Sequence, residues 1–362
     1  MRHDSPGVFI TKPPAPPPRI EGVALTLAAF IGVTAGEQHP DLVRSTEEFA
    51  HHWPGDTALA TAVEQFFANG GTRAWVVPLR TMTEKSVRRA VEDLDPDVAL
   101  VAIPDEPVAP PAIVAAAQAA LGDRGALLLL DGDWPDVSEA VTAMADPVGA
   151  VGASGGDCVV YWPRLSRPLP GGGSEDISPL GAVAGIIAHC EDVHGVDKTP
   201  AGVTARIAGV TGPAVSVDDL EMNPLNDKRI NVIRQFPGLG TVVWGARTLS
   251  SDPEWKYVPV RRMAVFLERS LRRGLQWAVF EPNGEPLWER VRMSIEDFLQ
   301  DMFRGGMLGG PRPDSSYFIR CDRSTMTQDD IDNGRLIIEV GFAPLRPAEF
   351  IVLRIRLDVA GG

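Results

Sequence analysis

The chain has 362 residues, enough for two or three domains, and 44% of them are hydrophobic, so wholesale disorder is excluded. Lys and Arg number 34 against 48 Asp and Glu, and the net charge of −14 argues against nucleic acid or an anionic membrane surface as the main partner. The chain contains no run of 18 apolar residues and no apolar stretch near its polar, proline-rich N-terminus, so neither a membrane-spanning helix nor a secretory signal is predicted.

The N-terminal segment joins a short β-prone piece to a proline-dense spacer. Val8 to Ile10 come first, and five prolines follow among residues 13–18. Proline fixes φ and lacks a backbone donor, so the spacer is expected to be extended. A strand-forming piece beyond a stiff spacer predicts an arm; a frayed terminus is the alternative.

Strands and helices alternate over the next 170 or so residues. Apolar runs predict strands at residues 23–33, 74–79, 98–103, 126–130 and 158–162. Helical spacing of apolar residues predicts helices at residues 57–68, 84–94, 111–121, 137–145 and 180–193. This alternation predicts a largely parallel sheet covered on both faces. Residues 163–180 are expected to form an exposed loop, and residues 195–225 to be irregular.

The charge balance changes near residue 225. Residues 1–225 hold 14 basic and 30 acidic side chains, whereas residues 226–362 hold 20 and 18. We therefore place a domain boundary there. In the second part, strands are expected at residues 240–249, 317–321 and 336–342, and helices at residues 260–278 and 286–304. The predicted fold class is α/β (α+β), with mixed sheets flanked by helices and extended β-strand arms at both ends.

The last segment has the period of a strand. Over residues 349–359, apolar side chains at alternate positions share one face, and Arg354 and Arg356 lie on the other. This pattern predicts a half-buried strand at the end of the chain.

The helix predicted at residues 260–278 has an apolar stripe and a basic side. Arg262, Arg269 and Arg273 fall within about 40° of one another, opposite the stripe. A charged outer face is usually only solvated. Arginine is nevertheless the better residue for ion pairs at an interface, so a positive ridge on an acidic chain also fits an acidic partner.

No convincing reaction centre is found, and the chain is not expected to be an enzyme. The sequence contains no GxxxxGK[ST], and neither a GxSxG elbow nor a GxGxxG lies between a predicted strand and the helix that follows it. His189, Cys190, Asp192 and His194 lie close together, but their spacing matches no strong metal-ligand template. Asp131 follows a predicted buried strand, where a turn role is favoured over a catalytic one. No catalytic, metal-binding or cofactor-binding residues are therefore assigned, and no cofactor is expected. Three cysteines far apart, an odd number, indicate reduced thiols in a cytosolic protein.

A series of motifs in order resembles the contractile tail sheath family of phages, bacteriocins and extracellular injection systems. In the second half these are NDKRINVIRQFPGLGTVVWGARTL (226–249), WKYVPVRRMAVFLERSL (255–271), QWAVFEPNGEPLWERVR (276–292), FLQDMFRGGMLGG (298–310), YFIRCD (317–322) and IDNGRLIIEVGFAPLRPAEFIVLRI (331–355). In the first half, PGVFI (6–10), FIGVT (30–34), FFANGGTRAWVV (66–77), AIPD (102–105) and YWPRL (161–165) also match. The resemblance is weakest from about residue 105 to residue 225, and the chain is compact where many sheath proteins carry additional outer domains.

The resemblance implies a structural subunit that polymerises helically around an inner tube and contracts to drive the tube into a target. It divides the chain into an arm and spacer (1–22), an acidic α/β region (23–225), a sheath core domain (226–346) and an arm strand (347–362). The implied partners are further copies of the chain, an inner tube protein, and baseplate and terminal cap proteins, with neither nucleic acid nor a membrane. Assembly is expected in the bacterial cytoplasm.

The resemblance also implies roles for particular residues. A helix of the C-terminal domain touches the tube in this family, and Arg262, Arg269 and Arg273 are the candidates here. The candidate arm strands, which would add to sheets of neighbouring copies, consist of Gly7, Val8, Phe9, Ile10, Phe350, Ile351, Val352, Leu353, Arg354, Ile355, Arg356 and Leu357.

Two alternatives remain open at this point. One is a soluble enzyme on a doubly wound α/β fold, and the other is a non-contractile shell or baseplate component with the same arms. Electron microscopy of the purified protein separates them, since it would show discrete small particles, rings that never elongate, or long hollow cylinders.

Overall fold

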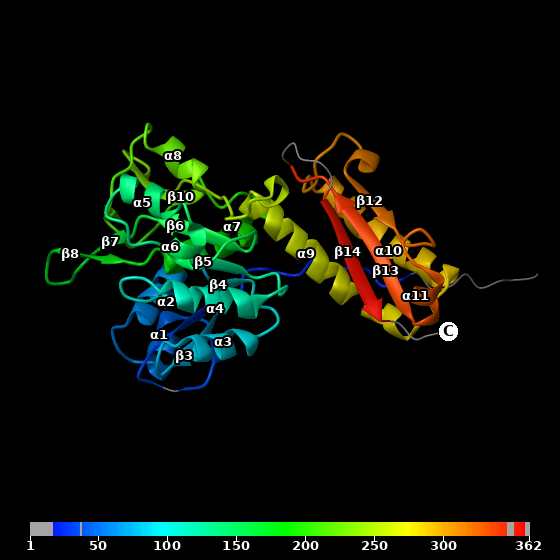
Figure 1. The fold of residues 1–362 in the computed structure, drawn as a ribbon, viewed down its shortest axis with the longest axis horizontal. Coiled ribbons are helices and arrows are strands. Elements are labelled where there is room, and N and C mark those ends of the chain that lie inside the picture. Colours follow the sequence, from blue (N-terminus) through cyan, green and yellow to red (C-terminus); the bar gives the residue numbers. More distant parts are fainter. Residues whose placement is uncertain (1–16, 37, 346–350, 359–362) are drawn as a thin grey trace, which may run out of the picture. The chain divides into compact units, whose positions relative to one another are not determined.

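The chain folds into two compact units. The computed structural model describes residues 17–36, 38–345 and 351–358. The large unit is Val23–Leu267, and the small unit combines Met1–Gly22 with Glu268–Gly362 (Figure 1). The division differs from the predicted boundary near residue 225. Strand β10 (Ile230–Phe236) pairs in parallel with β6 (Cys158–Trp162), which places the residues after 225 in the sheet of the large unit.

An eight-stranded sheet forms the centre of the large unit. Its order is β11-β10-β6-β5-β4-β1-β3-β2, and its pairs are parallel except at the two ends, where β2 and β11 run antiparallel to their neighbours. The remaining strands of the sheet are β1 (Ala28–Val33), β2 (Asp41–Val43), β3 (Ala74–Leu79), β4 (Leu100–Ala102), β5 (Leu127–Asp131) and β11 (Gly240–Val243). The predicted largely parallel sheet is thus confirmed.

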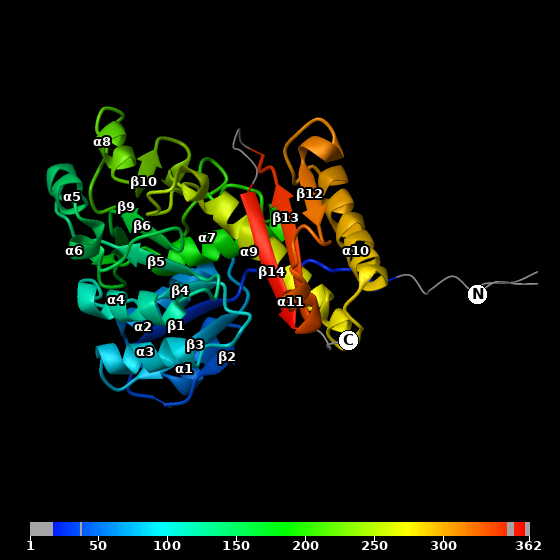
Figure 2. The ribbon, with the colours of Figure 1, turned by 45° about the vertical axis from the view of Figure 1, so that its right-hand side comes forward.

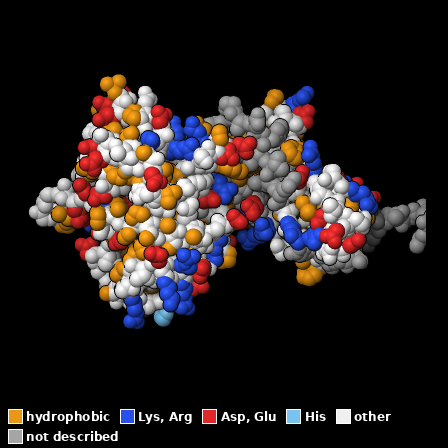
Figure 3. Space-filling view, in the orientation of Figure 1, with side chains coloured by type: hydrophobic (Ala, Val, Ile, Leu, Met, Phe, Trp, Pro, Cys, Tyr) orange, Lys and Arg blue, Asp and Glu red, His pale blue; other side chains and the backbone are white. Residues whose placement is uncertain are grey.

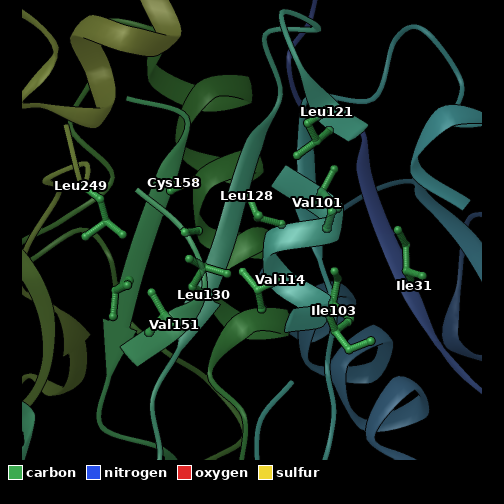
Figure 4. Close-up of a cluster of buried hydrophobic side chains, with 14 of the residues drawn as sticks. Ile31, Val101, Ile103, Val114, Leu121, Leu128, Leu130, Val151, Cys158 and Leu249 are labelled. Atoms are coloured by element: carbon green, nitrogen blue, oxygen red, sulfur yellow. The ribbon is translucent and has the colours of Figure 1, made fainter. Parts of the chain in front are cut away.

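Helices cover both faces of this sheet because its strands are apolar on both sides. Alternate residues of β5 enter two different clusters: Leu128 and Leu130 pack with α3, α4 and α5, whereas Leu127 and Leu129 pack with α1, α2 and α7. Figure 4 shows the first of these clusters. The helices are α1 (Thr46–His52), α2 (Ala58–Ala68), α3 (Glu84–Glu92), α4 (Pro111–Leu121), α5 (Val137–Ala143), α6 (Pro147–Val151), α7 (Leu180–His194) and α8 (Met222–Asp227).

Residues 163–180 form a hairpin rather than the predicted loop. Strands β7 (Leu165–Pro168) and β8 (Ser174–Ile177) pair antiparallel, and β9 (Gly212–Pro213) adds to β7. Arg167 lies opposite Glu175 and forms an ion pair with it, so a cross-strand charge pair stabilises a segment whose composition indicates turns.

The small unit contains the last turns of one long helix, the whole of a second long helix and a three-stranded antiparallel sheet, which are easiest to follow in Figure 2. Helix α9 (Val258–Gly274) enters it from the large unit, and α10 (Glu285–Arg304) follows after the short helix η2 (Gln276–Phe280). The sheet has the order β12-β13-β14, with β12 (Tyr317–Arg320), β13 (Arg335–Phe342) and β14 (Ile351–Asp358). The remaining short helices among the described residues are η1 (Pro253–Trp255), which belongs to the large unit, and η3 (Pro313–Ser315) and α11 (Gln328–Asp332) of the small unit.

Candidate assembly surfaces

Strand β14 is the part of the predicted arms that the structure describes. It pairs antiparallel with β13 of its own chain along its whole length, from Arg335 opposite Asp358 to Phe342 opposite Ile351. Ile355 and Leu357 are buried and Arg356 is exposed, so the predicted half-buried strand is confirmed. The candidate arm residues Gly7, Val8, Phe9, Ile10 and Phe350 lie outside the described residues.

The small sheet has two terminal strands, β12 and β14. A terminal strand has a row of backbone N–H and C=O groups on its outer side that another chain can bind. The middle strand, β13, directs four buried apolar side chains toward the core: Leu336, Ile338, Val340 and Phe342. A strand laid against β13 therefore gains main-chain hydrogen bonds together with apolar contacts at every second residue.

The structure corrects the placement of Arg262. Its side chain is 4% exposed, forms an ion pair with Glu191 of α7, and donates a hydrogen bond to the Leu25 carbonyl over 3.0 Å. A guanidinium enclosed in this way presents no charge to a partner, so Arg262 does not belong to an exposed basic face. Arg273 is exposed and Arg269 is half-buried, and their predicted contact with a tube remains a prediction.

The edge of the large sheet where doubly wound enzymes bind substrates holds Asp131. A cavity of about 130 Å³ lies there, lined by Asp131, Trp134, Val151 and other, mostly apolar residues. The Asp131 carboxylate accepts a hydrogen bond of 2.6 Å from Ser178, whose hydroxyl also accepts from the Leu180 N–H at the start of α7. Burial raises the pKa of Asp131 to about 6, partly opposed by this hydrogen bond. These contacts connect β5 to α7, so the Asp131 carboxylate has a structural role.

At the acidic and histidine-rich end of α7, Cys190 and Glu191 pack inside the unit, whereas His189, Asp192 and His194 are exposed. Cys190 is buried with its thiol directed at the carbonyls of Lys198 and Thr199, and Glu191 forms the ion pair with Arg262. In the described parts of the chain, no group of three or more His, Cys, Asp or Glu residues is arranged to hold a metal ion. No helix among the described residues is long and apolar enough to cross a membrane.

The surface of the large unit carries charged side chains of both signs and apolar side chains. On the face drawn in Figure 3, acidic, basic and apolar side chains are interspersed. The large unit's exposed apolar side chains include Leu220, at 86%, and Val203, at 60%. Isolated apolar residues of this kind are normal on a protein surface.

Comparison with known proteins gives concordant matches. The sequence profile described as "Phage tail sheath C-terminal domain" matches residues 250–358. A putative prophage major tail sheath protein of Pseudomonas aeruginosa is 26% identical over 173 residues, which are 46% of this chain and 42% of that protein, so the match spans less than half the length of this curated relative.

Solved structures match nearly the whole chain. The anti-feeding prophage (AFP) helical sheath in its contracted state is 30% identical, with a TM-score of 0.79, over 98% of this chain and 99% of that one. The sheath complex of an extracellular contractile injection system, PVC, also in its contracted state, is 28% identical with a TM-score of 0.79, over 98% of both chains. A sheath tail protein from Desulfitobacterium hafniense, at 10% identity and a TM-score of 0.67 over 98% of this chain and 100% of that one, shares the fold.

Proposed function

Because the chain belongs to the contractile tail sheath family, in which it is a structural sheath subunit, we propose that its copies polymerise helically around an inner tube and contract to drive that tube into a target. The observation that supports this most is the match, over almost the whole chain, to a helical sheath in its contracted state. A subunit with two different contact surfaces that join head to tail forms an open helical array.

Exchange of terminal strands would connect the copies. In this proposal Gly7 to Ile10 and Phe350 to Leu357 pair with sheets of neighbouring subunits. The eight-residue register between β13 and β14 provides the template, because an identical β14 from a second copy makes the same backbone bonds. Such an exchange also restores the burial of Ile355 and Leu357, so it has a low cost in free energy.

A cysteine pair across β13 and β14 tests this exchange. Ile337 lies opposite Arg356; the Ile337 side chain is half-buried and the Arg356 side chain is exposed. Ile337→Cys with Arg356→Cys therefore places two thiols close enough for oxidation to a disulfide. If the strand is exchanged, oxidised polymer gives a ladder of covalent oligomers on a non-reducing gel. The control is Ser166→Cys with Asp176→Cys in the β7–β8 hairpin, which must cross-link within one chain. A single intrachain product from both pairs in assembled polymer would contradict the exchange.

Contact with the tube is proposed for Arg269 and Arg273. A few exposed ion pairs hold two surfaces together while allowing release, since each contributes less than about 1 kcal/mol. Arg269→Glu with Arg273→Glu should abolish extended sheath on its tube. The matched control is Arg312→Glu with Arg320→Glu, two exposed arginines of the same unit. If the first variant assembles on the tube normally, another surface makes this contact.

We further infer a structural rather than a catalytic role, with baseplate and terminal cap proteins as additional partners and assembly in the bacterial cytoplasm. At the position that an enzyme of this fold would use, the Asp131 carboxylate is already bound by the Ser178 hydroxyl. Electron microscopy of purified protein mixed with tube should show long hollow cylinders. Discrete particles, or rings that never elongate, would support the alternatives of a soluble enzyme or a baseplate component.

A further inference from the structure

The two units are joined by the chain at two places. One connection passes from residue 22 to residue 23, and the other lies within α9, between residues 267 and 268. Shortly after the first connection enters the large unit it reaches Leu25, and shortly before the second leaves that unit it passes Arg262. Both residues are bound by the same side chain, Glu191 of α7.

Three groups form a closed ring of polar contacts inside the large unit. One carboxylate oxygen of Glu191 accepts a hydrogen bond of 2.7 Å from the Leu25 N–H, and the other forms the ion pair with Nη2 of Arg262. The same Nη2 donates to the Leu25 carbonyl over 3.0 Å. The backbone of one connection is therefore bound on both its N–H and its C=O, and each member of the ring contacts the other two.

The ring is shielded from water. The side chains of Arg262 and Glu191 are 4% and 10% exposed. Screening by salt and solvent is weak at such a site, and charge-assisted hydrogen bonds there are strong. Removing one member leaves the remaining charge buried and unpaired, so the two contacts with Leu25 are expected to weaken together.

The neighbouring arginine has a different arrangement. Arg261 makes a bidentate pair with Asp157, with distances of 2.6 and 3.0 Å, and the two side chains are 20% and 32% exposed. Asp157 directly precedes β6, so this ion pair connects α9 to the large sheet and not to the chain at Leu25. Two adjacent residues of one helix thus differ in whether they also bind the other connection.

We propose that Glu191, Arg262 and the Leu25 backbone form a clamp that fixes both chain connections to one point of the large unit. The two connections then act as one mechanical element within that unit. Loosening of either connection at the clamp loosens the other. This inference follows from contacts within the large unit and does not depend on the sheath role.

Hydrogen–deuterium exchange of the full, unassembled chain tests the clamp. Arg262→Met removes the guanidinium that α9 contributes to the clamp. Glu191, which is the direct partner of the Leu25 N–H, stays in place. The clamp nevertheless predicts that exchange becomes about tenfold faster or more at residues 23–27 as well as at residues 258–267. Glu191→Gln should have the same effect on both segments. Arg261→Met, the matched control, should accelerate exchange in α9 and leave residues 23–27 as in the parent.

A double variant keeps the test decisive if the single variants do not fold. Glu191→Leu with Arg262→Met removes both charges, so no unpaired charge remains buried, and such replacements usually preserve the fold. It should retain the parent's protection in β5 and β6 while residues 23–27 exchange about tenfold faster or more. Parent-like protection of residues 23–27 in this variant, or an Arg262→Met effect confined to α9, would overturn the proposal.

Discussion

Replacing Asp131 with asparagine should stabilise the large unit at neutral pH. Burial at the edge of the sheet raises the pKa of this carboxyl from its ordinary 3.8 to about 6. A group whose pKa is higher in the folded state stabilises the fold while it is protonated. That contribution is complete below pH 3.8 and is lost as the pH rises through about 6. The asparagine side chain is neutral throughout and retains an oxygen that can accept from Ser178.

The magnitude follows from the two pKa values. Each tenfold change in proton affinity corresponds to about 1.4 kcal/mol, so the free energy of unfolding should change by up to about 3 kcal/mol over this pH interval because of Asp131 alone. The quantity to compare is the difference between the Asp131→Asn variant and the parent, since ionisation elsewhere in the chain then cancels. This difference should favour the variant increasingly from pH 4 to pH 7.5.

Urea denaturation of the unassembled chain, followed by tryptophan fluorescence at a series of pH values, measures this difference. Ser178→Ala gives a second, opposite perturbation. The hydroxyl stabilises the carboxylate, so its removal should raise the pKa of Asp131 further and steepen the loss of stability above pH 6. A variant-minus-parent difference that is constant from pH 4 to pH 7.5, or that changes in the opposite direction, would refute the electrostatic reasoning.

Two further predictions concern packing and thiol chemistry. A Cβ at Gly181 would lie 2.1 Å from the Ala62 carbonyl oxygen, so Gly181→Ala should cost about 1–3 kcal/mol in thermal or chemical unfolding, whereas Gly171→Ala, with nothing within 4 Å, should be neutral. Equal stability of both variants would argue against this contact. Burial raises the pKa of Cys158 and Cys321 to about 12, so neither thiol should react with iodoacetamide at pH 8 until guanidinium unfolds the chain. Rapid labelling of either one in the folded protein, detected by peptide mass, would contradict their burial.

The sequence predicts the elements whose own residues determine them. The strands at residues 74–79 and 158–162 and the helix at residues 111–121 have the predicted bounds, because continuous apolar runs and a proline at the first helical position are local signals. The alternation in the last segment likewise predicts a strand with Ile355 and Leu357 inside. The ordered motifs identify the family because they extend over both halves of the chain.

The elements that the sequence misses depend on partners far along the chain. Strand β10 contains Asn231, a polar residue that would normally lie at a surface. Here it is fully buried, donates to the carbonyls of Val160 and Arg247, and accepts from the Arg247 N–H. Arg262 is a similar case. Helical periodicity places it opposite an apolar stripe, but periodicity does not reveal that Glu191 and Leu25 cover that side as well.

The large sheet ends differently from the small one. At one end, β2 has only three residues, and at the other the outer side of β11 is already bonded by residues 202–207, where Ile207 donates to Thr241 and Val243 donates to Ala205. Off-pathway aggregation through this sheet is thereby suppressed, because neither border gives a foreign chain a long row of free backbone groups. The largest sheet of each copy therefore offers little backbone to which a second copy could add a strand.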